Sequence, residues 1–151
     1  MEGLDRIVRE HRFFAGLDEA FSSLICGCAK NVRFEAGQYL FHEAQPADWF
    51  YLIRHGRVAL SVTVPGRGSI RFQTVGEGEV VGLSWLVPPY RWSYDAQALE
   101  LTRAIAMDAS CLRGKCEQDH DLGYEMMKRF VPVLVERLQA TQLQILDVYG
   151  H

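Results

Sequence analysis

Apolar positions near the N-terminus recur at intervals of three and four residues, which is the period of an amphipathic helix. One such series begins at Leu4 and a second begins at Leu17, with a break at Gly16 between them. Asp18 is a suitable first-turn residue for the second helix, because its carboxylate can accept from free backbone N–H groups. Residues 1–29 are therefore predicted to form helices.

Between residues 30 and 108 the apolar spacing changes to that of short strands separated by glycine and proline turns. The clearest strand covers residues 58–64, where valine and leucine alternate with small or polar residues, as in a strand with one buried face. Pro65-Gly66-Arg67-Gly68 follows as a hairpin loop. The segment predicts about eight short strands, a number typical of a double-sheet jelly roll.

The chain after residue 108 is predicted to be helical to its end. Asp108 can cap a first helix, and Asp119 or Asp121 can cap a longer second one. Pro132 is expected to kink the long helix or to end its first part, because proline lacks a backbone donor and clashes with the preceding turn.

An apolar stripe follows the long helix with alternating spacings of four and three residues. Its members are Leu134, Leu138, Thr141, Ile145 and Val148. This is the a/d spacing of a paired helix, so it predicts a homodimer formed through the C-terminal helix. The same stripe can instead pack on the chain's own roll or on another protein.

The composition narrows the classes of function. With 151 residues the chain can form one domain, since about 68–70% of the unfolded surface is buried at this length. A net charge of −3 leaves no general basic field for nucleic acid, and no apolar run approaches the roughly 18 residues of a membrane span. The charged N-terminus lacks the apolar region of a signal peptide, so the cytoplasm is the expected compartment, with no nucleic-acid or membrane partner.

The four cysteines are predicted to be reduced and mostly buried. Cys26 and Cys28 lie two positions apart and Cys111 and Cys116 lie five apart, and neither spacing is the CxxC pair of a metal or iron–sulfur site. A disulfide is disfavoured by the expected compartment.

No catalytic constellation can be assembled from the sequence. A jelly roll of the cupin type becomes a metalloenzyme through His-x-His with a glutamate and a later histidine, and the nearest approach here is His42-Glu43. No Ser/His/Asp or Cys/His set is evident. The prediction is a protein that is not an enzyme and has no metal or resident cofactor.

Residues 76–98, GEGEVVGLSWLVPPYRWSYDAQA, carry the clearest chemistry. A strand leads to Gly82 and one short helical turn, and Arg91 follows after a proline stop. The start of a helical turn leaves backbone N–H groups free for an anion, and an arginine can add a charge-assisted bond. We therefore predict an anion on the amides of Ser84 and Trp85.

This layout resembles the phosphate-binding cassette of the cyclic nucleotide-binding domain family. The resemblance extends over nearly the whole chain, through the phrases FFAGL, AGQYLF, ADWFYLIRHGRVAL and ERLQATQLQ. It implies one domain over residues 1–151, with N-terminal helices in 1–29, a β-roll in 30–108 that contains the cassette 76–98, and C-terminal helices in 109–151.

The resemblance also implies a ligand site, with cAMP or cGMP as candidate ligands. The implied ligand-binding residues of the cassette are Gly82, Leu83, Ser84, Trp85, Arg91, Trp92 and Ser93, and the implied base contacts are Thr141 and Gln142. The family has a glutamate where this chain has Leu83, and Arg91 follows sooner than the family's arginine. Loss of that charged acceptor removes roughly 1.5–3 kcal/mol, so a cyclic nucleotide is expected to bind weakly.

Three functions remain open at this point. The first is a regulatory or sensor module that binds a cyclic nucleotide or another small anion. The second is a ligand-free interaction or dimerisation module whose pocket is filled by Trp85, Trp92 and Tyr90, and the third and least favoured is a cupin-like metalloenzyme. In the resembled transcription factors a DNA-binding domain follows the last helix, whereas this sequence stops at His151, so no such domain is expected.

Overall fold

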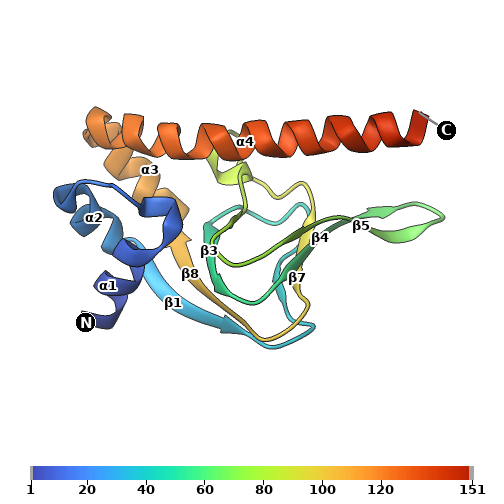
Figure 1. Ribbon diagram of the computed structural model, residues 1–151, viewed down its shortest axis with the longest axis horizontal. Helices are drawn as coiled ribbons and strands as arrows, with labels where there is room; N and C mark the ends of the chain where they lie inside the picture. The colour runs from blue at the N-terminus through green and yellow to red at the C-terminus, as the bar shows by residue number, and fades with distance from the viewer. Residues whose placement is uncertain (1, 150–151) are drawn as a thin grey trace.

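The structure is a computed structural model that describes residues 2–149, and it confirms the predicted jelly roll with flanking helices (Figure 1). The eight strands form two four-stranded antiparallel sheets. The first sheet contains, in order, β1 (Ala29–Phe34), β8 (Thr102–Asp108), β3 (Trp49–His55) and β6 (Val80–Val81). The second contains β2 (Tyr39–Phe41), β7 (Asp95–Ala98), β4 (Val58–Val64) and β5 (Gly68–Val75).

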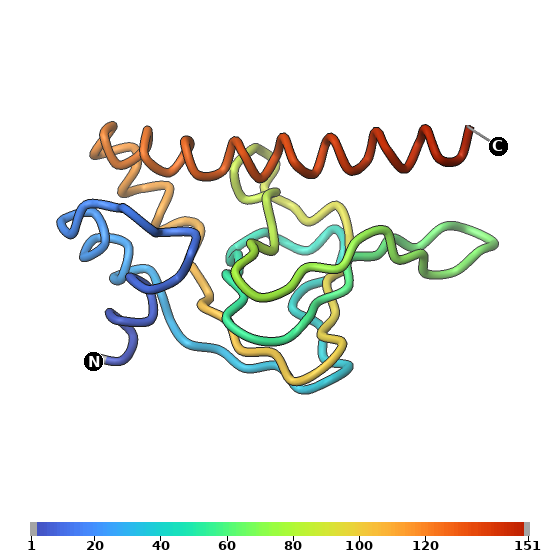
Figure 2. The backbone as a smooth tube through the Cα atoms, in the orientation of Figure 1, coloured from blue at the N-terminus to red at the C-terminus, as the bar shows by residue number. Residues whose placement is uncertain are grey.

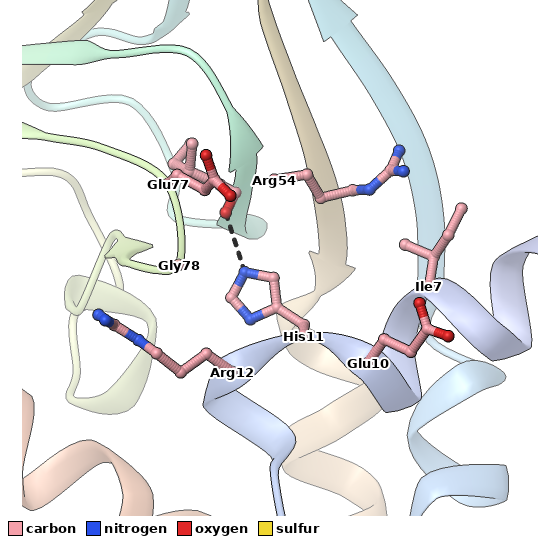
Figure 3. Close-up of a pocket in the computed structure, with 8 residues that line it drawn as sticks. Ile7, Glu10, His11, Arg12, Arg54, Glu77 and Gly78 are labelled. Atoms are coloured by element: carbon pink, nitrogen blue, oxygen red, sulfur yellow. Dashed lines mark hydrogen bonds between the residues drawn. The ribbon is translucent and has the colours of Figure 1, made fainter.

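The N-terminal part forms α1 (Glu2–Glu10), the short 3-10 helix η1 (Arg12–Phe14) and α2 (Glu19–Cys26). Asp18 caps α2, since its carboxylate accepts from the backbone N–H of Ala20 at 3.0 Å. His11 is buried where η1 meets the roll, and its ring is directed at β3 (Figure 3). These helices therefore pack against the first sheet.

After the roll the chain continues through α3 (Ala109–Gln118) into α4 (His120–Tyr149). Asp108 and Asp119 cap these helices as predicted, since Asp108 accepts from Cys111 N and Asp119 accepts from Leu122 N. The tube in Figure 2 follows α4 along one side of the molecule, past the roll and beside the β4–β5 hairpin. Gln144 of α4 donates to the Phe72 carbonyl of β5 at 3.0 Å, which ties the helix to that hairpin.

The prediction for Pro132 was wrong, because α4 neither ends nor bends sharply there (Figure 1). The helix runs unbroken for 30 residues with Pro132 inside it, and Figure 1 shows no sharp bend. Pro132 and Lys128, whose carbonyl would receive the missing bond, are both exposed. Water can therefore satisfy the Lys128 carbonyl, and the helix tolerates the proline.

The prediction of four reduced cysteines was also wrong, because Cys28 and Cys111 form a disulfide with Cα atoms 5.7 Å apart. The two residues are separated by 83 positions, but β1 and β8 pair side by side and bring Cys28 next to the start of α3. Asp108 N donates to the Cys28 carbonyl at 2.8 Å in the same place. Cys26 and Cys116 are free thiols.

An aromatic cluster joins the roll to the first half of α4. Trp85 stacks on Phe50 of β3 with ring centroids 4.5 Å apart, and Phe130 of α4 meets the Trp85 ring edge-on at 5.3 Å. All three rings are buried. The cluster holds the short turn η2 (Ser84–Leu86), and with it the cassette, between β3 and α4.

Candidate ligand site between the roll and the long helix

A cavity of about 400 Å³ lies between the roll, the cassette turn and α4. Residues of the roll, of the cassette and of α4 all contribute to its wall. They are Leu60, Phe72, Gln73, Leu83, Ser84, Leu86, Val87, Ser93, Tyr94, Leu134, Arg137 and Thr141. Because three separate parts of the chain meet here, a molecule in the cavity contacts both the roll and the long helix.

Arg137 is the charged group of this wall. Its Nη2 donates to the Val80 carbonyl of β6, which holds the side chain against the roll. Its Nη1 is buried and has no hydrogen-bond partner among the residues of the described chain. Burial lowers the pKa of Arg137, while Tyr94, Glu79 and Glu136 act in the opposite direction. Arginine remains protonated in proteins, so the site contains a half-buried cation whose Nη1 can still donate a hydrogen bond.

Four residues with hydroxyl groups line the same cavity as Arg137. They are Ser84, Ser93, Tyr94 and Thr141. Burial raises the pKa of Tyr94, although the positive charge of Arg137 acts against this, so the phenol is neutral and able to donate. The Thr141 hydroxyl donates to the Arg137 carbonyl at 2.9 Å within the same helix, and its oxygen can still accept.

The structure brings together four of the nine residues proposed from the sequence. Leu83, Ser84, Ser93 and Thr141 line the same cavity. Gly82 lies beneath them with φ of +104°, and a Cβ there would come within 2.5 Å of the Trp92 ring, so glycine is required by both the backbone and the close approach.

The other four residues lie elsewhere. Trp85 belongs to the aromatic cluster, and Trp92 is buried in the roll with its ring stacked on Phe41 at 3.7 Å. The exposed Arg91 donates to the Ala44 carbonyl at 2.9 Å and does not line the cavity. Gln142 is exposed on α4 and is likewise not part of the wall.

Sequence reasoning missed Arg137, the cation of the site, although a signal was present. Arg137 precedes Thr141 by four positions in the phrase ERLQATQLQ, so the two residues share one face of the helix. Tyr94 and Phe72 were missed for a different reason, because only the pairing of the second sheet places them beside α4.

The comparison with known families agrees with this architecture. A model of the cyclic nucleotide-binding domain matches residues 31–119, which is more than half of the chain. The chain therefore belongs to the cyclic nucleotide-binding domain family.

Individual relatives are distant. The chain is 27% identical to cyclic nucleotide-gated ion channel 18 of Arabidopsis thaliana, over 91% of this chain and 19% of the channel. It is 22% identical to a CRP-like cAMP-activated global transcriptional regulator of Mycobacterium tuberculosis, over 96% of this chain and 63% of the regulator. The chain thus spans less than two thirds of either relative.

The fold has solved counterparts. A protein from Geobacter metallireducens named as cyclic nucleotide-binding is similar with a TM-score of 0.79 and 26% identity, over 89% of this chain and 97% of that one.

Within residues 2–149, no group of three or more His, Cys, Asp or Glu side chains is placed to hold a metal ion. Among the helices of the same range, none has the length and apolarity needed to cross a membrane.

Proposed function

We propose that this chain is a regulatory module that binds a small anionic ligand in the cavity between the roll and α4. One observation carries the proposal: Arg137 lines the cavity, and its buried Nη1 has no hydrogen-bond partner within the described residues. An unpartnered buried donor is costly, and an anion that accepts from it removes that cost.

The position of Arg137 also supports a regulatory role. The ligand would contact Leu83 and Ser84 of the cassette on one side and Arg137 and Thr141 of α4 on the other. Binding would therefore stabilise the arrangement in which α4 lies against the roll. A ligand that binds one arrangement better than another shifts the equilibrium between them. The module acts by binding and not by catalysis.

The output of the module is proposed to be a homodimer formed through α4. The last part of this helix is exposed, with Leu138 at 59% and Ile145 at 52% of full exposure. Tyr124, Met127 and Val131 are exposed too, and they extend the three–four spacing of the stripe toward the start of α4. The stripe from residue 124 to residue 148 is about 36 Å long at 1.5 Å per residue, long enough for a two-helix seam.

A second candidate function is a dimerisation module without a ligand. The position of Arg91 favours it, because a guanidinium that donates to the Ala44 carbonyl is not available to a phosphate in the cavity. This alternative predicts the same dimer but no ligand-dependent stabilisation.

Thermal-shift measurements with millimolar cAMP, cGMP, inorganic phosphate and small carboxylates would separate the two. A ligand that binds the native state at about one hundred times its Kd adds about 2.7 kcal/mol of stability. We expect at least one anion to raise the Tm of the wild type and to lose this effect in Arg137→Gln. Arg103→Gln, which removes one exposed charge on β8, is the matched control and should keep the effect. No shift with any of these anions would contradict the proposal and favour the ligand-free module.

A further inference from the structure

The wall of the cavity is mainly apolar. Carbon-rich side chains from the roll, the cassette and α4 supply most of it, namely Leu60, Phe72, Leu83, Leu86, Val87 and Leu134. The Phe72 and Tyr94 rings meet edge-on with centroids 5.5 Å apart, which gives the wall a fixed aromatic corner. A ligand that fills this space needs an apolar body, because polar groups would lose their bonds to water there.

The residues that line the cavity carry one formal charge, which is positive. Arg137 is the charged residue among those that line it. Arg137 also borders a second cavity, but Glu79 and Glu136 line that one together with Arg12. An anion in the second cavity would face two carboxylates, whereas an anion beside Tyr94 and Thr141 faces none. Electrostatics therefore place the anionic group on the apolar side of Arg137, and one cation balances one negative charge.

A cyclic nucleotide fits this chemistry poorly even though it carries a single charge. Among the described residues, no carboxylate lines the cavity to accept from its ribose hydroxyl, and the guanidinium of Arg91 is engaged outside the cavity. Each polar group left without a partner in such a site weakens binding by about tenfold or more. A carboxylate on a hydrocarbon body has no further polar group to satisfy, and a carboxylate on an indole body has only the ring N–H.

We propose that the cavity is selective for an apolar monocarboxylate, with its carboxylate on Arg137 and its body against Leu83, Leu86 and Phe72. The inference rests on the proposed function, because it assigns the ligand class of that same site. The hydroxyls of Ser84, Ser93 and Tyr94 and the amide of Gln73 are further donors among the residues that line the cavity.

The test is calorimetric titration of the full chain with four probes. These are decanoate, indole-3-propionate, the neutral indole-3-propionamide and cAMP. We expect both carboxylates to bind and the amide to bind about tenfold or more weakly, since a bond to a charged partner is lost. Arg137→Gln should weaken the carboxylates by a similar factor and leave the amide unchanged. Arg137→Lys, which keeps the charge, should retain part of the affinity, and Arg103→Gln should retain all of it.

Each other outcome overturns the inference in a recognisable way. Equal binding of acid and amide, or equal binding to wild type and Arg137→Gln, would mean adsorption to an apolar surface. Binding of cAMP that depends on Arg137, without binding of either carboxylate, would overturn the ligand class but keep the proposed function. If no probe binds the folded wild type, the inference fails, and the anion panel of the preceding section then decides whether the proposed function fails with it. If Arg137→Gln does not fold, the acid–amide pair on the wild type still decides the question.

Discussion

His11 shows how a single buried residue connects the N-terminal helices to the roll. Its Nδ1 accepts from the backbone N–H of Phe13 at 3.1 Å, and its Nε2 lies 2.9 Å from the Ile53 carbonyl of β3 (Figure 3). Since Nδ1 is the acceptor, the proton resides on Nε2 and is donated to Ile53. Burial lowers the pKa of His11, and the nearby cations Arg12 and Arg54 act in the same direction.

This lowered pKa predicts that the folded state loses stability as the pH falls below about 6.5, the ordinary value for histidine. Below that value the unfolded chain binds a proton that the folded chain resists, so stability is complete above it and declines as the pH drops. Urea unfolding at pH 7.5 and pH 5.5 for wild type and His11→Asn measures this. The variant should be less stable at pH 7.5 and should lose less stability on acidification. Equal pH dependence in both proteins would contradict the assignment.

Substitution of Arg91 and of Arg137 should affect ligand affinity differently, which tests which arginine holds the ligand. Arg91 donates to the Ala44 carbonyl on the surface, so Arg91→Gln should leave the affinity for an anionic probe within about twofold. Arg137→Gln should lower it by about tenfold or more. Calorimetry with indole-3-propionate or cAMP, whichever binds, gives both values. A large loss in Arg91→Gln would restore the site predicted from the sequence.

The residues of the site were predictable only where local sequence decides their position. Gly82 to Ser84 form a turn whose backbone places Leu83 and Ser84 at the cavity. The directions of Trp85 and Trp92 depend instead on Phe50 and Phe41, which lie far away in the sequence. No local pattern specifies such ring contacts, so both tryptophans entered the predicted site although they pack in the core.

At the scale of the element, α4 contributes to both the cavity and the exposed stripe. Leu134, Arg137 and Thr141 line the cavity, and Leu134 is also exposed, as are Val131 and Leu138 beside it (Figure 1 shows the helix along the side of the roll). An amphipathic helix normally hides its apolar face against the protein, whereas the apolar face of α4 continues into solvent. A second copy of the helix is the partner that we propose for it.

Leu138→Glu should give a folded monomer, because it places a charge in the proposed seam without touching the roll. Leu143→Glu is the matched control, since Leu143 is 67% exposed and lies about 140° around the helix from Leu138. Light scattering at high micromolar concentration is the measurement. We expect a dimer for wild type and for Leu143→Glu, and a monomer for Leu138→Glu. A wild type that is monomeric at these concentrations would rule out the proposed dimer there.

The elements themselves were largely predictable, because each carries its own signal. The strand at residues 58–64 and the caps at Asp108 and Asp119 were predicted correctly from a few neighbouring positions, although the first three residues of the strand are all buried and do not alternate. Pro132 was misread because its effect depends on whether the Lys128 carbonyl reaches water, which is a property of the packed structure.

At the scale of the whole molecule, the Cys28–Cys111 disulfide joins the two ends of the roll. It links residues 83 positions apart, and a crosslink over such a span typically contributes about 2–4 kcal/mol to stability. Reduction should therefore lower the Tm by about 5–15 °C. Thiol titration of the denatured, non-reduced chain should find the two free thiols Cys26 and Cys116. Four reactive thiols would contradict the disulfide.

The sequence predicted the jelly roll but not this crosslink. Strand patterns show that β1 and β8 exist, whereas their pairing brings Cys28 to Cys111 and follows only from the complete topology. Arg137 differs in part, because the phrase ERLQATQLQ already puts it on the face of Thr141, whereas its contact with the Val80 carbonyl follows only from the packing of α4 beside β6.

The most direct test of the account is whether an anion binds between the roll and α4 through Arg137. Amide chemical-shift mapping of the wild type and of Arg137→Gln, with indole-3-propionate and in parallel with cAMP, shows where each probe binds and whether its binding depends on Arg137. The account predicts shifts concentrated at Leu83, Ser84, Tyr94 and residues 134–141 in the wild type, and their loss in Arg137→Gln. Shifts centred elsewhere, shifts that persist in Arg137→Gln, or no shifts with either probe would contradict it.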